Sequence, residues 1–148
     1  MVTTNKSFLD CVAFLHDARC LETTWDCSHR DVRAIRMKVV VDIDSGLSEW
    51  NGRTLLITLS RVFAVRFTGW GIISNECIDD WKQGLSEFLE RERAALVSRG
   101  LSILPFGFII SFSSGSELEV ICSDVSALVV DRVSMTRLPC HSTVSRHV

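Results

Sequence analysis

The sequence predicts an α+β domain that is mainly β, built as an antiparallel sandwich or strongly curved sheet with one inserted helix. Alternating apolar and polar residues mark strands both early and late in the chain, and a single stretch with helical spacing lies between them. A parallel sheet would need repeated strand–helix–strand units, which the sequence lacks. We expect residues 1–138 to form one globular domain and residues 139–148 to form a flexible tail.

The early strands are predicted by two alternating segments. Apolar residues occupy the odd positions from Ile35 to Ile43, and Leu21, Thr23, Trp25 and Cys27 alternate with polar residues before them. The short polar connection "SHRD" joins the two segments, so we expect a hairpin whose odd positions face the core.

A second alternating region, "RTLLITLSRVFAVRFTG", follows a turn-rich loop. Arg61 interrupts its apolar series, which predicts either two strands or one long strand bent there by a bulge. The late region "PFGFIISFSSGSELEVICSDVSALVVDRV" reads as three strands, with turns at residues 113–116 and at Ser123–Asp124. In this reading Glu117 and Glu119 face water.

The inserted helix is predicted at about residues 86–99. Ser86 can cap its first turn, and Gly100 follows as the terminating residue. Ile78, Trp81 and Leu85 continue the helical spacing upstream, which suggests a further helix capped by Asn75 and a break near Gly84, since glycine disfavours a helix interior. A short N-terminal helix is expected from Lys6 to Leu15.

Composition narrows the function classes. The net charge of −2 argues against a nucleic-acid partner, and no apolar run is long enough for a membrane span. The N-terminus lacks the pattern of a secretion signal, so we expect a cytoplasmic protein with mostly buried, reduced cysteines.

Catalytic and metal-binding patterns are weak. Cys20, Cys27 and His29 are spaced too far apart to match structural zinc sites, in which two cysteines lie close together in the sequence. His16 and Asp17 could serve as an acid–base pair, but a local structural role is favoured. No phosphate-loop, hydrolase or zinc-protease motif is present. We therefore expect no enzyme activity, no catalytic residues, no metal and no cofactor, with a small Cys/His enzyme as the alternative.

The loop "DIDSGLSEWNGR" is the predicted partner-binding site. It fails the calcium-loop pattern, because its fifth, sixth and twelfth positions are Gly46, Leu47 and Arg53. Its acids could pair with a basic protein while a tryptophan fills a pocket, although that tryptophan could instead cover the sheet edge. The residues assigned to partner binding are Asp42, Asp44, Glu49 and Trp50.

The run "FLHDARCLETTWDCSHRDVRAIRMKVVV", followed by "LLITLSRVFAVRF", resembles small bacterial β-rich proteins of the polymorphic-toxin immunity type, such as immunity protein 50. The hairpin "ISFSSGSELEVICSDV" is similar to the closing hairpin of such proteins. The resemblance implies a single-domain protein that binds and neutralises a toxin, and it supplies no catalytic residues. A structural subunit of a larger assembly is a further alternative, and the oligomeric state stays open.

Overall fold

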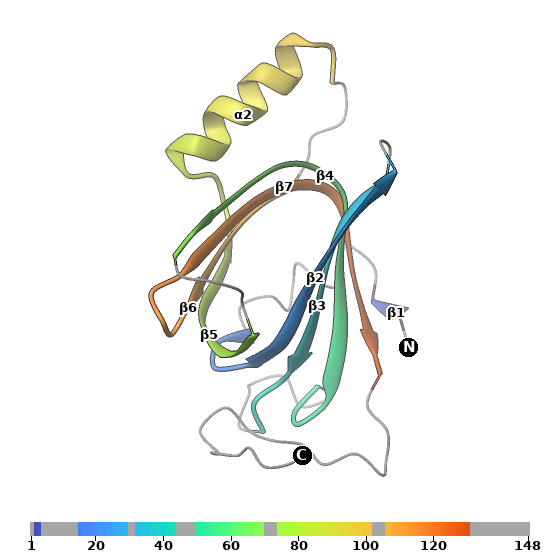
Figure 1. Ribbon diagram of the computed structural model, residues 1–148, viewed down its shortest axis with the longest axis vertical. Helices are drawn as coiled ribbons and strands as arrows, with labels where there is room; N and C mark the ends of the chain where they lie inside the picture. Colours follow the sequence, from blue (N-terminus) through green and yellow to red (C-terminus); the bar gives the residue numbers. More distant parts are fainter. Residues whose placement is uncertain are drawn as a thin grey trace.

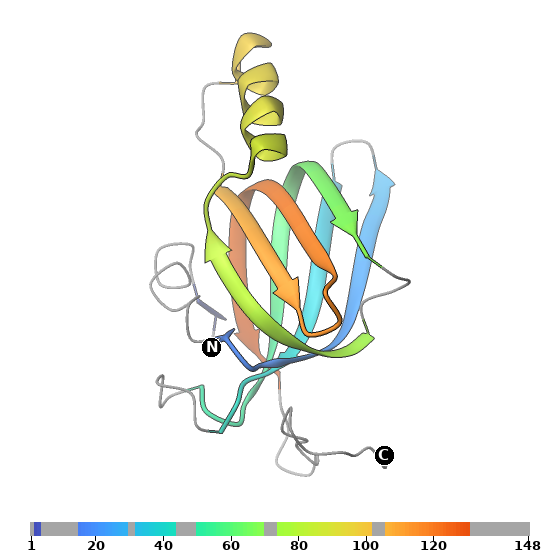
Figure 2. The same cartoon turned by 90° about the vertical axis from the view of Figure 1, so that its left-hand side faces the viewer.

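Six strands of the chain close into an antiparallel barrel (Figures 1 and 2). The computed structural model describes residues 2–3, 15–29, 32–43, 50–69, 74–101 and 106–130. The order around the barrel is β7-β4-β3-β2-β5-β6 and back to β7, and β1 adds to the other end of β7. The elements are β1 (Val2–Thr3), β2 (Arg19–His29), β3 (Val32–Val40), β4 (Thr54–Thr68), β5 (Ser74–Gln83), α2 (Glu87–Ser98), β6 (Phe106–Phe112) and β7 (Glu117–Val129).

The mainly β character with one inserted helix is confirmed, but the expected sandwich is wrong. A sandwich needs two separate sheets, whereas here β7 bonds to β6 through its first half and to β4 along almost its whole length. Because β4 and β7 are long and bent, a single sheet curls until its ends meet. The N-terminal helix expected at residues 6–15 lies outside the described residues except for Leu15, as does the predicted tail at residues 139–148.

The predicted hairpin and the bent strand are confirmed. β2 and β3 pair antiparallel, and β4 is one strand rather than two. Arg61 has a positive φ of 52°, and the β4–β7 register shifts just beyond it, between Val62 and Ala64. The break in the apolar series therefore marks a bulge that bends the strand.

The helix predicted upstream of Gly84 is wrong, because residues 74–83 form β5. A register shift between Ile78 and Asp80 places Asp79 and Asp80 at the surface. Ile78 and Trp81 consequently both face the core although they are three residues apart. A bulged strand has here the spacing of a helix, which explains the misreading.

Helix α2 is confirmed within one residue at each end. The Ser86 hydroxyl accepts a hydrogen bond from the Leu89 backbone N–H at 3.2 Å, as a helix cap does. Gly100 ends the helix with a φ of +98°. Only Leu89 of this helix is fully buried, and the helix lies across one end of the barrel, above β4 and β7 in Figure 1.

Two expectations for β7 are wrong. The Ser123–Asp124 pair makes no turn, because the ladder with β4 continues through it, with Asp124 opposite Ser60 and Cys122 opposite Val62. Glu119 does not face water: its side chain is 1% exposed. Alternation does point Glu119 out of the barrel. Helix α2 lies close to β7, however, and the carboxylate is hydrogen-bonded to Arg66 and Ser86 instead of facing water.

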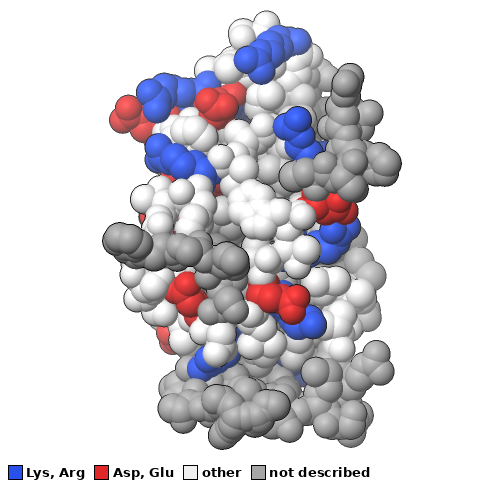
Figure 3. Space-filling model, viewed as in Figure 1, with Lys and Arg blue, Asp and Glu red and all other residues white. Residues whose placement is uncertain are grey.

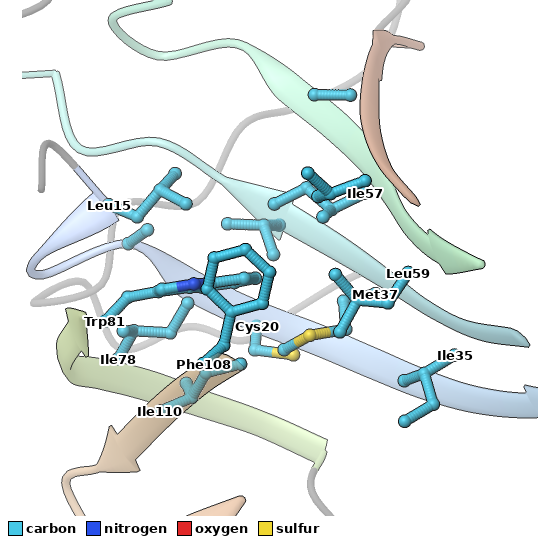
Figure 4. Packing of buried hydrophobic residues seen from close by; sticks show 14 of the residues in the cluster. Leu15, Cys20, Ile35, Met37, Ile57, Leu59, Ile78, Trp81, Phe108 and Ile110 are labelled. Atoms are coloured by element: carbon cyan, nitrogen blue, oxygen red, sulfur yellow. The ribbon is translucent and has the colours of Figure 1, made fainter. Parts of the chain in front are cut away.

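The barrel interior is filled by apolar side chains from all six strands (Figure 4). Trp81 meets Phe108 edge to face with ring centroids 6.0 Å apart. Residues from β2, β3 and β4 pack around this pair, and Leu15 lies at the edge of the cluster on the Trp81 side, at the upper left in Figure 4. The interior is therefore a packed core of the kind expected for a small barrel.

Candidate functional site

The four residues predicted to bind a partner do not all fall in the described part of the chain. Asp44 and Glu49 lie outside it, and Asp42 is half-buried. Trp50 is 3% exposed and belongs to the core cluster. The partner-binding role of this group stays a prediction, but the position of Trp50 agrees with the alternative, in which its ring covers the core.

The backbone around Trp50 explains its inward position. The Val41 N–H donates to the Arg53 carbonyl at 2.9 Å, and the Gly52 N–H returns a bond to Val41 at 3.0 Å. Gly52 has a φ of 71°, which lets the chain turn tightly into β4. This turn joins the end of β3 to the start of β4 and holds Trp50 against the barrel.

A more exposed candidate surface lies along β2. The β2–β3 ladder runs from Arg19 to His29, but the β2–β5 ladder covers only Arg19 to Glu22. Beyond Glu22, within the residues that the structure describes, β2 has a neighbouring strand on its β3 side alone. We call the backbone and side chains of Thr23, Thr24 and Trp25 the β2 edge.

Trp25 is the most unusual member of the β2 edge. It pairs with Ile35, whose side chain is buried in the core, so Trp25 is on the inward face of the β2–β3 ladder. In a fully closed barrel this position would be covered, yet Trp25 is 45% exposed. The sequence predicted its inward face correctly but not its exposure, which follows from the short β2–β5 ladder.

Charged pairs flank the β2 edge on the opposite face. Glu22 lies 3.9 Å from Lys38, and Asp26 lies 3.3 Å from Arg36. In both pairs the acid is on β2 and the cation is on β3. Positive and negative side chains alternate over the face in Figure 3, and neither sign gathers into one large patch.

Helix α2 carries a second candidate surface, an open and mainly apolar depression of about 450 Å³. Val97, at its edge, is 51% exposed. The depression also carries one cation and one anion, so it offers no net charge by which a partner could be chosen. Its described lining residues are Leu85, Glu90, Arg93, Ala94, Val97 and Ser98.

The buried Glu119 carboxylate joins the barrel to the start of helix α2. Arg66 Nε donates to Glu119 Oε2 at 2.6 Å, and the Arg66 guanidinium lies 4.5 Å from the centre of the Phe88 ring. Burial alone would raise the pKa of the Glu119 carboxyl, but hydrogen bonds from Arg66 and Ser86 and the charge of Arg66 lower it below its usual value. The ionised pair therefore stabilises the docked helix.

Acid is expected to remove this contribution. A carboxyl whose pKa is lowered by folding adds stability above its unfolded pKa, near 4.5, and that stability is lost as the pH falls through the folded pKa. The difference in unfolding free energy between wild type and Glu119→Gln should therefore shrink when urea unfolding is repeated from neutral pH into the acid range. The double variant Arg66→Met/Glu119→Gln is the control. A difference that does not change with pH would contradict the assignment.

Two described cysteines are buried free thiols. Burial raises the pKa of Cys20 to about 11 and that of Cys122 to about 12, far above neutral pH. A nucleophilic cysteine needs the opposite shift. Cys77, by contrast, is disulfide-bonded, and its partner is neither Cys20 nor Cys122, so Cys77 is an exception to the expectation of mostly reduced cysteines.

Alkylation should follow the thiol burial. In native protein at neutral pH, iodoacetamide is expected to label Cys20 and Cys122 at least about tenfold more slowly than in urea-unfolded protein, because the thiolate form is rare and shielded. Peptide mass spectrometry over a time course measures both rates in one sample. Fast native labelling of either residue would revive the Cys/His enzyme alternative.

His16 and Asp17 do meet, although not through a strand. Both lie in a turn, where His16 Nδ1 is 3.1 Å from Asp17 Oδ2 and both side chains are more than half exposed. Asp17 has a φ of 66°, and its backbone N–H bonds to the Ile78 carbonyl at 2.8 Å. This turn anchors the entry to β2 against β5, which is a structural role.

The described residues contain no cluster of three or more metal-ligating side chains, and no helix among them is long and apolar enough to cross a membrane. Comparison of the chain with protein-family models, with curated proteins and with solved structures finds no match.

Proposed function

We propose that this chain is a non-enzymatic protein-binding domain that acts as an immunity protein and neutralises a cognate toxin. The observation that carries the proposal is Trp25, a large aromatic side chain held 45% exposed on a rigid strand pair. Tryptophan is enriched among the residues that dominate binding energy at protein interfaces. A rigid support also keeps the entropy cost of ordering small when a partner binds.

The chemistry of the other candidate groups favours binding over catalysis. The raised pKa values of Cys20 and Cys122 keep both thiols protonated at neutral pH. The barrel interior, where small barrels can hold a ligand, is filled by the side chains of the core cluster. The toxin-neutralising role itself comes from the sequence resemblance.

Co-expression with the product of the neighbouring gene tests the proposal. We expect that product to inhibit growth when expressed alone, and growth to recover when this chain is co-expressed. The two purified proteins should elute together in size-exclusion chromatography, with light scattering giving the mass of a defined complex. A neighbour that is harmless and elutes separately would refute the toxin-neutralising role, and an obligate oligomer of this chain alone would favour a structural subunit.

A further inference from the structure

We infer that the β2 edge is the docking surface, and that it accepts an extended segment in which basic residues alternate with apolar ones. The inference rests on the proposed function and specifies the kind of partner. The segment would add to the barrel sheet as a further strand beside β2, on the side where the β2–β5 ladder ends at Glu22.

Backbone chemistry defines the shape of this segment. Each strand residue carries one N–H and one C=O, and a strand with a neighbour on one side presents half of these groups outward. For Thr23, Thr24 and Trp25 the neighbouring described strand is β3. An extended peptide matches such a row of donors and acceptors, whereas a helix, whose backbone groups are satisfied internally, does not.

Trp25 defines the apolar positions. Side chains alternate across a strand, so residues of the incoming segment that lie beside Trp25 share its inward face. There they would cover the Trp25 indole, which is 45% exposed and lies beside its cross-strand partner Ile35, a residue of the core. An apolar side chain at this position would remove from water both its own surface and the exposed surface of the indole.

Charge defines the positions between them. Glu22 and Asp26 lie on β2 itself, with Thr24 between them on the outward face, while Lys38 and Arg36 lie on β3. A new strand beside β2 would therefore be next to the two acids, whereas the two cations on β3 would be one strand further away. The Glu22 side chain is 58% exposed and 3.9 Å from Lys38, which leaves it able to pair with a second cation.

The same charges argue against a second copy of this chain. In a symmetric antiparallel pairing of two β2 edges centred on Thr24, Glu22 of one copy would lie opposite Asp26 of the other. Like charges directly opposite one another destabilise a sheet. A basic segment replaces this repulsion with attraction, so the acids select the partner against self-association.

A synthetic peptide tests this directly. The probe alternates lysine and valine over roughly nine residues, about the length of a long strand. We expect it to bind the full chain and, by NMR, to slow hydrogen exchange of those amides among Thr23, Thr24 and Trp25 that point away from β3. A glutamate–valine peptide and a lysine–valine peptide with alternate backbone amides N-methylated should each bind at least about tenfold more weakly. Protection at helix α2 instead, or equal binding of all three peptides, would overturn the inference.

Matched variants separate the surface from the function. Trp25→Ala and Glu22→Lys should each weaken lysine–valine peptide binding at least about tenfold, whereas Val97→Ala, at a slightly more exposed apolar position on helix α2, should leave it unchanged. Circular dichroism and thermal melting confirm that each variant is folded. If the neutralised toxin binds wild type, Trp25→Ala and Glu22→Lys equally, the docking surface is wrong while the proposed function stands. If the peptide binds as described but no toxin is neutralised, the proposed function fails and the docking surface stands.

Discussion

Replacing Trp50 with alanine is expected to lower the free energy of unfolding by about 3–5 kcal/mol, as for other buried tryptophans. Trp50 is 3% exposed, belongs to the core cluster and lies in the turn that joins β3 to β4. Removal of the indole leaves a cavity that this hydrogen-bonded turn cannot fully fill. Urea unfolding followed by circular dichroism measures the loss.

Trp25→Ala provides a control with the same residue type. Its side chain is 45% exposed, so its loss should lower the unfolding free energy by about 1–2 kcal/mol, clearly less than the loss of Trp50. The affinity for the partner should respond in the opposite order. Trp25→Ala should lower this affinity, and the folded fraction of Trp50→Ala should keep it unchanged. If Trp50→Ala keeps wild-type stability and loses the partner, the loop site predicted from the sequence is the correct one.

The two tryptophans show what alternation in a sequence can and cannot predict. The period of two correctly placed Trp25 on the same face as the buried Ile35. Whether that face is covered depends on β5, which follows Trp25 by about fifty residues and pairs with β2 only as far as Glu22. Pairing between such distant segments carries no local sequence signal, and so neither barrel closure nor the exposed edge could be predicted.

Bulges account for the other differences between prediction and structure. At Arg61 a charged residue interrupts an apolar series, so the bulge in β4 was predictable. In β5 the bulge between Ile78 and Asp80 instead mimics a helix. It makes successive core-facing residues three positions apart in the sequence, where a regular strand has them two apart. Glu119 illustrates a third limit, since alternation predicts its outward direction but not the helix that covers it.

Gly107 in β6 illustrates how tightly the segment before helix α2 lies on the barrel. The Gly84 N–H donates to the Gly107 carbonyl at 2.9 Å, and a Cβ built on Gly107 would lie 2.6 Å from the Gly84 carbonyl oxygen and also clash with Leu85 Cδ2. Leu85 could rotate away, but the Gly84 carbonyl is backbone and must move with its neighbours. These neighbours include Ser86, which caps the helix and also bonds Glu119.

Gly107→Ala is therefore expected to destabilise the protein by about 1–3 kcal/mol through overpacking. It should also displace the start of helix α2, which NMR would report as shifts in the Ser86 and Leu89 amide signals. Gly84→Ala is the matched control, because a Cβ at Gly84 meets nothing within 4 Å and should change stability by no more than about 0.5 kcal/mol. If the two variants prove equally stable, the close approach of these two backbones does not fix the helix. A loss confined to Gly107→Ala, with the Leu89 amide shifted, identifies this contact as the point that positions helix α2 over the barrel.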